Sequence, residues 1–191
     1  MNGVKIGFAL CGSFCTFESA LAQMEQLKKT GADVTPIFSE QAYNTDTRFG
    51  TAKSFRERAE AVTGQSIIHT IVQAEPIGPK KMFDLLLVEP CTGNTLGKLA
   101  NGITDTAVTM ACKSHLRTAR PLLLAVSTND ALSGSAKSIG ALMSRSSVFF
   151  VPMRQDNSAE KPRSIVADFS KTEQAIRSAL KGEQLQPIVF G

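Results

Sequence analysis

Residues 85–111 constrain the fold of this chain more than any other part of the sequence. They open with the apolar run 85–88, which is typical of a strand buried on both faces of a parallel sheet. The run breaks at Pro90, and small or hydroxyl-bearing residues follow before a helical pattern begins. A polar loop between a strand end and a helix start offers backbone N–H groups and hydroxyls to an anion. We therefore expect a ligand-binding loop here.

Four other apolar runs are similar to this strand, and patterns of helical spacing separate them along the chain. The runs predict strands at residues 4–10, 33–38, 121–126 and 148–151. The helical patterns cover the segment between Thr16 and Gly31 and residues 52–63, 131–145 and 171–180. Because strands that alternate with helices form parallel sheets, we expect one α/β domain over residues 1–191. Its architecture should be a three-layer, Rossmann-like (flavodoxin-like) parallel sheet with helices on both faces.

The size and composition of the chain fit a single globular domain. A chain of 191 residues is long enough to bury one core, and its 42% hydrophobic and 20% charged residues are typical of a soluble protein. No apolar run approaches the roughly 20 residues that span a bilayer, and no secretory signal is visible. We therefore expect a cytoplasmic protein that has no membrane partner.

The charge and the aromatic content favour a small anionic partner. The formal net charge is +4, but Lys and Arg are scattered, and the chain has one Tyr and no Trp on which bases could stack. Nucleic acid is therefore not expected as a partner. The cysteines show no metal-binding spacing, so we expect free thiols and no metal site. They are Cys11, Cys15, Cys91 and Cys112.

Small polar residues follow several of the predicted strands at the point where each strand ends. They lie at Gly12-Ser13, at Ser39 and at residues 90–95, 127–129 and 154–157. Since parallel sheets bind ligands at the carboxyl ends of their strands, these segments should share one rim. The Gly12-Ser13 turn is a weak motif by itself, because it lacks the G-x-G-x-x-G spacing, and a tight turn without a ligand is an equal alternative.

Two segments of the central stretch carry a resemblance to a known family. Residues 90–95 read PCTGNT, and residues 98–105 read KLANGITD. In this spacing they are similar to the P-A-S-A-N-T and K-x-A-x-G-I-A-D signature of the flavoprotein family that includes phosphopantothenoylcysteine decarboxylase and the flavin prenyltransferases. That family also opens with a strand and a Gly-Ser turn, and the likeness extends over residues 5–151. In the family these loops hold FMN.

The resemblance implies a set of cofactor ligands around FMN, or around a phosphate that occupies its site. They are Gly12, Ser13, Ser39, Pro90, Thr92, Asn94, Thr95 and Ser127. The hydroxyls of Thr92 and Thr95 and the amide of Asn94 suit a phosphate or a flavin edge, while a helix cap without a ligand is the alternative. Cys91 is interpreted as a packing thiol, and Lys98 as a solvated or structural residue.

Two departures from the decarboxylase pattern bear on the reaction. Residues 127–129 read STN where those enzymes carry P-A-M-N, so only Asn129 carries over. The flap cysteine of those enzymes has no counterpart in residues 152–157. The planar guanidinium of Arg154 suits a carboxylate bidentately, so Arg154 is predicted to bind substrate. Asn129 is predicted to bind the second carboxylate of the substrate, with the flavin as the alternative. A surface arginine without a ligand is an equal alternative for Arg154, and no catalytic residue is assigned.

Within the family, the opening GFALCGSFCTF and the segment FFVPMRQDNSAEKPRSIVADF are most similar to subunits that act in spore formation beside a dehydrogenase-like A subunit. The resemblance implies NAD(P)-linked oxidation of a small dicarboxylate in the mother cell, with the NAD(P) site in the A subunit. It also implies a homo-oligomer, either a trimer or a dodecamer. The alternatives are a free-standing FMN-dependent decarboxylase or flavin prenyltransferase, and a non-catalytic scaffold subunit.

Overall fold

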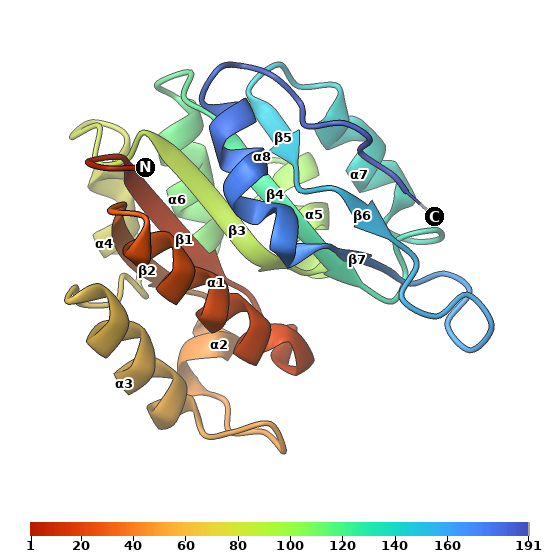
Figure 1. The fold of residues 1–191 in the computed structure, drawn as a ribbon, viewed down its shortest axis with the longest axis horizontal. Coiled ribbons are helices and arrows are strands. Elements are labelled where there is room, and N and C mark those ends of the chain that lie inside the picture. The colour runs from red at the N-terminus through yellow and green to blue at the C-terminus, as the bar shows by residue number, and fades with distance from the viewer. Residues whose placement is uncertain (191) are drawn as a thin grey trace.

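A sheet of seven strands forms the centre of the molecule (Figure 1). The computed structural model describes residues 1–190 of the chain. Five strands run parallel in the order β2-β1-β3-β4-β5. They are β1 (Lys5–Leu10), β2 (Asp33–Phe38), β3 (Leu85–Cys91), β4 (Leu122–Thr128) and β5 (Val148–Phe150). The alternation of strands and helices thus predicted the α/β architecture correctly.

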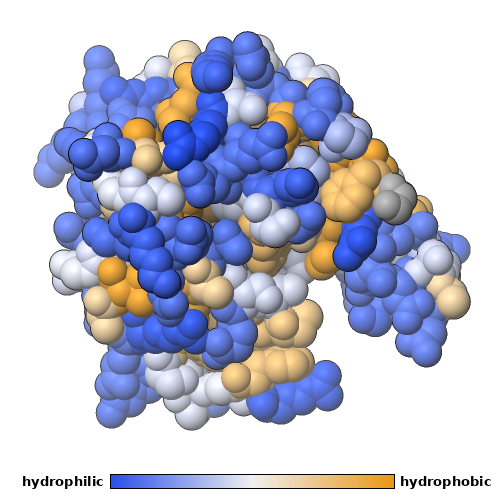
Figure 2. Space-filling view, in the orientation of Figure 1, coloured by the Kyte–Doolittle hydropathy of each residue, from blue (hydrophilic) through white to orange (hydrophobic). Residues whose placement is uncertain are grey.

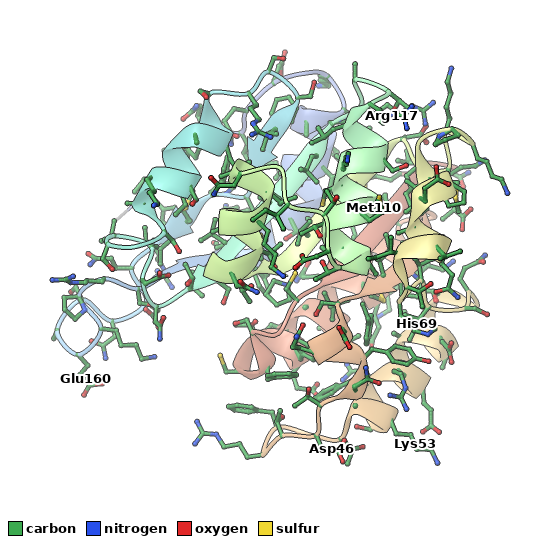
Figure 3. All side chains as sticks on the ribbon, turned by 180° about the vertical axis from the view of Figure 1, so that it is seen from behind. Asp46, Lys53, His69, Met110, Arg117 and Glu160 are labelled. Atoms are coloured by element: carbon green, nitrogen blue, oxygen red, sulfur yellow. The ribbon has the colours of Figure 1, made fainter. Side chains whose placement is uncertain are left out.

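Helices cover both faces of the sheet, which makes three layers. In front of the sheet in Figure 1 lie α1 (Phe17–Lys29) and α8 (Thr172–Ala179). Behind it lie α5 (Gly93–Ala100), α6 (Ala107–Leu116) and α7 (Ala136–Met143), which face the viewer in Figure 3. Between β2 and β3 the chain forms α2 (Glu40–Asn44), α3 (Ala52–Thr63) and α4 (Ile71–Ala74). Short 3-10 turns lie at Phe14–Thr16, Glu75–Ile77 and Phe169–Lys171.

The parallel strands are buried because helices shield them on both sides. Every residue of β3 is buried, as expected for a central strand of a parallel sheet. The largest side chains with almost no exposed surface are phenylalanines of the sheet and of α1, namely Phe8, Phe17, Phe38 and Phe150. This core fixes the strand ends, where the predicted polar segments lie. Within residues 1–190, no helix combines the length and the apolarity that crossing a membrane requires.

The prediction of a parallel sheet is wrong for two short strands. β6 (Met153–Arg154) and β7 (Ile165–Ala167) pair antiparallel with each other, and β7 also pairs antiparallel with the end of β4. The sequence predicted only a polar segment after the fifth strand at this place. Strands of two and three residues are too short to show a periodic pattern, and the pairing of β7 with β4 is a long-range contact.

β3 does not break at Pro90 as the sequence predicted, but continues to Cys91. Proline has no N–H and cannot donate a ladder hydrogen bond. The register between β3 and β4 therefore shifts between Val88 and Cys91 instead of ending.

α7 begins at Ala136, five residues after the predicted start at residue 131. The side chain of Asp130 explains the delay. Its carboxylate accepts hydrogen bonds from the hydroxyls of Thr128 and Ser135, at 2.6 and 2.8 Å, and its carbonyl accepts the amide of Ser135 at 3.1 Å. These bonds hold residues 130–135 in turns before the helix starts.

The loop between β6 and β7 projects from the body of the molecule. Figure 2 shows it as a mostly hydrophilic arm that a recess separates from the body, and Figure 3 labels Glu160 in it. Side chains within the loop hold it together: Lys161 Nζ lies 3.1 Å from a carboxylate oxygen of Asp156, and Asn157 accepts the amide of Glu160 at 3.0 Å.

Candidate cofactor site

A cavity of about 240 Å³ opens at the carboxyl ends of β1 and β3. The turn after β1, the start of α2, the first turns of α5 and the residue before α6 form its walls. The lining residues are Cys11, Gly12, Phe14, Ser39, Gln41, Thr92, Asn94, Thr95, Lys98 and Thr106. Five residues that the sequence predicted as cofactor ligands are therefore gathered here: Gly12, Ser39, Thr92, Asn94 and Thr95.

The turn after β1 carries backbone N–H groups that the chain leaves unused. Among the hydrogen bonds of residues 1–190, none has the amide of Gly12 or Phe14 as its donor. A Cβ at Gly12 would approach no neighbouring atom closer than 3.6 Å, so packing within the chain does not require a glycine. Because glycine has no side chain, the backbone here is open to the cavity, and an anion can approach the amides closely.

The first turn of α5 supplies a second set of donors. Thr92 caps the helix, because its Oγ1 accepts the amide of Thr95 at 3.3 Å. The amides of Gly93 and Asn94 are at helix positions that have no acceptor inside the helix. The side chain of Asn94 is exposed and makes no hydrogen bond with any described residue. Thr92 therefore caps the helix, as the alternative interpretation expected. The same helix end still has free N–H donors, which favour binding of a phosphate.

Thr95 links this helix end to the end of β1. Its hydroxyl donates to Cys11 Sγ at 3.2 Å and lies 3.1 Å from the hydroxyl of Thr92. Burial raises the pKa of the Cys11 thiol to about 11, although the hydrogen bond from Thr95 lowers it. Cys11 is therefore a neutral thiol in the cavity wall. All four cysteines are free, as predicted: Cys11, Cys91 and Cys112 are buried, and Cys15 is exposed.

The predicted serine ligands are engaged with the chain itself. Ser39 Oγ accepts the amide of Ala42 at 3.2 Å and so caps α2, although Ser39 also lines the cavity. Ser13 Oγ lies 2.9 Å from Ser127 Oγ, and neither of these two serines lines the cavity. Their contact joins the turn after β1 to the end of β4 across the rim.

Three other predicted site residues lie away from this cavity. Pro90 is buried inside β3, where its carbonyl accepts the amide of Cys11 at 3.3 Å. Asn129 is exposed in the turn after β4, and Arg154 is exposed on β6. The structure therefore does not bring the predicted substrate residues into the cavity that holds the predicted cofactor residues.

Arg154 belongs to a separate cleft of about 420 Å³ between α1 and the β6–β7 hairpin. Its guanidinium carbon lies 5.7 Å from the centre of the Phe190 ring, and no carboxylate of a described residue forms an ion pair with it. The side chain is therefore available to an anionic ligand. The other polar residues of the cleft are Thr16, Ser19, Gln23, Asp168 and Ser170.

Several residues of the cofactor cavity were not predicted as ligands, and Lys98 is the most informative of them. Its side chain is only 22% exposed and lines the cavity, so the interpretation as a solvated or structural residue was incomplete. Lys98 follows Asn94 by four residues on α5, and helical spacing places such residues on one face. That spacing is the signal that could have found it. The others are Cys11, Phe14, Gln41 and Thr106.

The donors around this cavity fit the phosphate end of a flavin nucleotide. Unused amides, hydroxyls and one cation are the groups that bind phosphate in proteins. The cavity is smaller than the roughly 300–1,000 Å³ of sites that enclose a drug-sized ligand, so it fits part of FMN rather than the whole molecule. For comparison, residues 1–190 contain no group of three or more His, Cys, Asp and Glu side chains suited to a metal ion.

Comparison with known proteins points to the family that the signature suggested. The profile of the Flavoprotein family matches residues 1–171. The B subunit of dipicolinate synthase from Bacillus subtilis (strain 168) is 43% identical over 189 residues, which cover 99% of this chain and 94% of that protein. The crystal structure of the B subunit of dipicolinate synthase from Bacillus halodurans matches with a TM-score of 0.91 at 39% identity, covering 100% of this chain and 99% of that one.

A more distant structure shares the fold alone. The dodecameric FMN-dependent Ubix-like decarboxylase from Escherichia coli O157:H7 matches with a TM-score of 0.63 at 21% identity, covering 78% of this chain and 80% of that one. The family profile covers most of the chain, and the two B subunits match over nearly their whole lengths. The chain therefore belongs to the flavoprotein family and, within it, to the group of dipicolinate synthase B subunits.

Proposed function

We propose that this chain works as the B subunit of a dipicolinate synthase and that it holds FMN, or a phosphate in the place of FMN, at the ends of β1 and β3. The observation that carries the proposal is the convergence of Gly12, Thr92, Asn94 and Thr95 in one cavity. Their amides and hydroxyls are donors for an anion. Membership of a flavoprotein family supports a flavin nucleotide as that anion.

Different residues of the cavity would contact different parts of the cofactor. The unused amides of Gly12 and Phe14 and the N-terminus of α5 would hold the phosphate, because both offer N–H donors at strand ends. The exposed amide of Asn94 would contact the ribityl chain or the flavin edge. When bound, FMN supplies a two-electron acceptor. The part of the flavin outside the cavity would be open to a partner subunit.

The small dicarboxylate substrate is proposed to bind at Arg154 and Asn129. Arg154 offers a planar fork for a carboxylate and has no ion-pair partner of its own among the described residues. Asn129 is exposed at the end of β4. A dehydrogenase-like A subunit would bring the NAD(P) site. Formation of dipicolinate removes two hydrogens from a dihydrodipicolinate-type precursor: NAD(P)⁺ accepts one as hydride, and the other leaves as a proton.

A mixing experiment tests the two-subunit assignment. The purified chain alone should form no dipicolinate from a dihydrodipicolinate-type substrate and NAD(P)⁺, and addition of the A subunit should start turnover. In the mixture, a chain with Thr92→Ala and Asn94→Ala should turn over about tenfold more slowly, because two hydrogen bonds to the cofactor are lost. Robust turnover by this chain without a partner would contradict the assignment.

A free-standing FMN-dependent decarboxylase is the second candidate, and the shared fold with the Escherichia coli decarboxylase favours it. The absence of a cysteine in residues 152–157 counts against this candidate, because the flap cysteine of the related decarboxylases then has no counterpart. This candidate predicts release of CO₂ without the A subunit. A third outcome, full turnover of the mixture with the Thr92→Ala, Asn94→Ala variant, would indicate a scaffold subunit that needs no cofactor.

We also propose that the chain forms a homo-oligomer, a trimer or a dodecamer, in the mother-cell cytoplasm of a spore-forming bacterium. The support comes from relatives: a dodecameric decarboxylase shares the fold, and the matched B subunit is a Bacillus protein. The mass of the purified protein in solution tests the oligomer.

A further inference from the structure

We propose that Lys98 makes this cavity select a phosphorylated flavin over an unphosphorylated one, and that Asp105 positions its ammonium group. The inference rests on the proposed function, because it concerns the same cavity and the same cofactor. It goes beyond that function by naming the residue that discriminates between FMN and riboflavin, a residue the flavoprotein signature did not indicate as a ligand.

Lys98 is the only cationic side chain among the described residues that line the cavity. A phosphate monoester brings nearly two negative charges at neutral pH. The other donors, which are backbone amides, hydroxyls and the amides of Asn94 and Gln41, are neutral. Neutral donors alone do not balance the charge of the phosphate. Lys98 is therefore the group in this lining that favours the charged cofactor.

The position of Lys98 on α5 places it beside the other ligands. It follows Asn94 by four residues, so the two side chains leave the same face of the helix. Its side chain is 22% exposed, so it is covered far more than an ordinary surface lysine, and lysines that lose their contact with solvent are usually paired with a negative group.

Asp105 is that negative group. Its Oδ1 and Oδ2 lie 2.8 and 2.9 Å from Lys98 Nζ, and the hydrogen bond from Lys98 lowers the pKa of the Asp105 carboxyl. Asp105 is itself 57% exposed, so the ion pair extends from solvent to the cavity. An ammonium group has three N–H donors. One hydrogen bond, to Asp105 Oδ2, joins the ammonium group to the carboxylate, so N–H donors remain for an anion in the cavity.

An ordinary surface ion pair is the simpler explanation of the same contact, and Lys53 provides the comparison. Lys53 and Glu57 on α3 lie 3.7 Å apart, and their side chains are 75% and 66% exposed. Ion pairs as exposed as this one contribute little to the stability of a protein. Lys98 differs from Lys53 in its burial and in its place beside the cavity. Lys53 is therefore a matched control, and Figure 3 shows it on α3, apart from α5.

Flavin fluorescence tests the inference by comparing two ligands. Titrations with FMN and with riboflavin give Kd values for the full chain and for Lys98→Met, Lys98→Arg and Lys53→Met. Loss of a charge-assisted hydrogen bond should weaken FMN binding roughly ten- to a hundredfold. Riboflavin binding should be almost unchanged, which also shows that the Lys98→Met chain is folded. Lys98→Arg should keep most of the preference for FMN, and Lys53→Met should keep all of it.

The outcomes separate this inference from the proposed function. If FMN binds to the unsubstituted chain and Lys98→Met leaves the ratio of the two Kd values unchanged, the inference is wrong and the flavin site stands. If the unsubstituted chain binds neither flavin, the proposed flavin site fails and the inference fails with it. Inorganic phosphate gives a second measurement: it should compete with FMN on the unsubstituted chain and compete more weakly after Lys98→Met.

A double-mutant comparison tests the role of Asp105. Asp105→Asn should change the preference for FMN over riboflavin when Lys98 is present and should leave it unchanged in the Lys98→Met background, because Asp105 acts through the ammonium group. A merely structural aspartate would alter the binding of both flavins together. Equal changes of the preference in both backgrounds would show that Asp105 does not position Lys98.

Discussion

Glu89 lies inside β3 with no part of its side chain exposed. Its Oε2 accepts a hydrogen bond from the hydroxyl of Thr172 at 2.6 Å, and its Oε1 has no partner among the described residues. Burial raises the pKa of the carboxyl to about 8, although the bond from Thr172 lowers it. The carboxyl is therefore mostly protonated at neutral pH in the folded chain.

The stability of the chain should consequently depend on pH through Glu89. In the unfolded chain this carboxyl titrates near 4.5, so between pH 4.5 and pH 8 the unfolded state loses a proton that the folded state keeps. The free energy of unfolding therefore falls as the pH rises through this window, by about 3 kcal/mol from pH 5 to pH 7.5. Glu89→Gln should remove this fall, and urea unfolding at the two pH values measures it.

Glu57→Gln is the control for this prediction. Glu57 is largely exposed on α3, so its substitution should leave the pH dependence of the unfolding free energy as it is. A Glu89→Gln chain that loses stability between the two pH values as steeply as the unsubstituted chain would show that another group causes the effect.

Single site residues could be predicted where a contiguous motif fixes the backbone. Thr92, Asn94 and Thr95 lie together across one helix start, and the structure gathers them in one cavity. Ser13 could not be placed in this way, because its hydroxyl contacts Ser127, which is 114 residues further along the chain. The direction of a hydroxyl depends on such distant neighbours, and the local sequence carries no record of them.

At the scale of elements, the start of α5 packs tightly against the loop after β4 at Gly93. A Cβ on this glycine would lie 2.5 Å from Ser135 Oγ, 2.7 Å from Thr128 Oγ1 and 2.8 Å from Asp130 Oδ1. Hydrogen bonds join these atoms, because both hydroxyls donate to Asp130 Oδ1. The group cannot retreat from an added methyl without losing those bonds.

Gly93→Ala should therefore destabilise the chain and displace the start of α5. Overpacking of this kind costs about 1–3 kcal/mol. The affinity for FMN should fall with it, because Thr92 and Asn94 move with the helix start. Thermal unfolding and FMN titration of the same preparation measure the two effects.

The matched control is Gly97→Ala on the same helix, where a Cβ would meet nothing within 4 Å. The better helix propensity of alanine should make this variant more stable by up to about 1 kcal/mol. The diagnostic result is that the two substitutions change the stability of the chain in opposite directions. If both glycines tolerate alanine equally, the packing at Gly93 does not hold the helix start.

Long elements could be predicted to the residue where clear end signals exist. Helix α3 runs from residue 52 to residue 63 as predicted, because Thr51 caps its start and Gly64, with φ at 69°, ends it in a left-handed conformation. β6 and β7 have no comparable signals. β7 exists because the end of β4 offers it a pairing edge, and β6 pairs with β7 in turn. Tertiary context of this kind does not show in a short segment.

At the scale of the whole molecule, the parallel strand order brings several polar segments to one rim, as the alternation of strands and helices predicted. The division of this rim into two cavities was not predicted. It depends on the β6–β7 hairpin, which pairs Arg154 with Val166 and places Arg154 in the cleft beside α1. Five of the residues predicted for the cofactor therefore line one cavity, and Arg154, predicted for the substrate, lines another.

The measurement that tests the flavin site most directly is a visible absorption spectrum of the purified chain, taken after incubation with FMN and gel filtration. We expect a yellow protein in which FMN elutes with a peak larger than the 20.5 kDa monomer. The Thr92→Ala, Asn94→Ala chain should elute at the same mass with much less flavin. A colourless protein that cannot be reconstituted with FMN would contradict the proposed site.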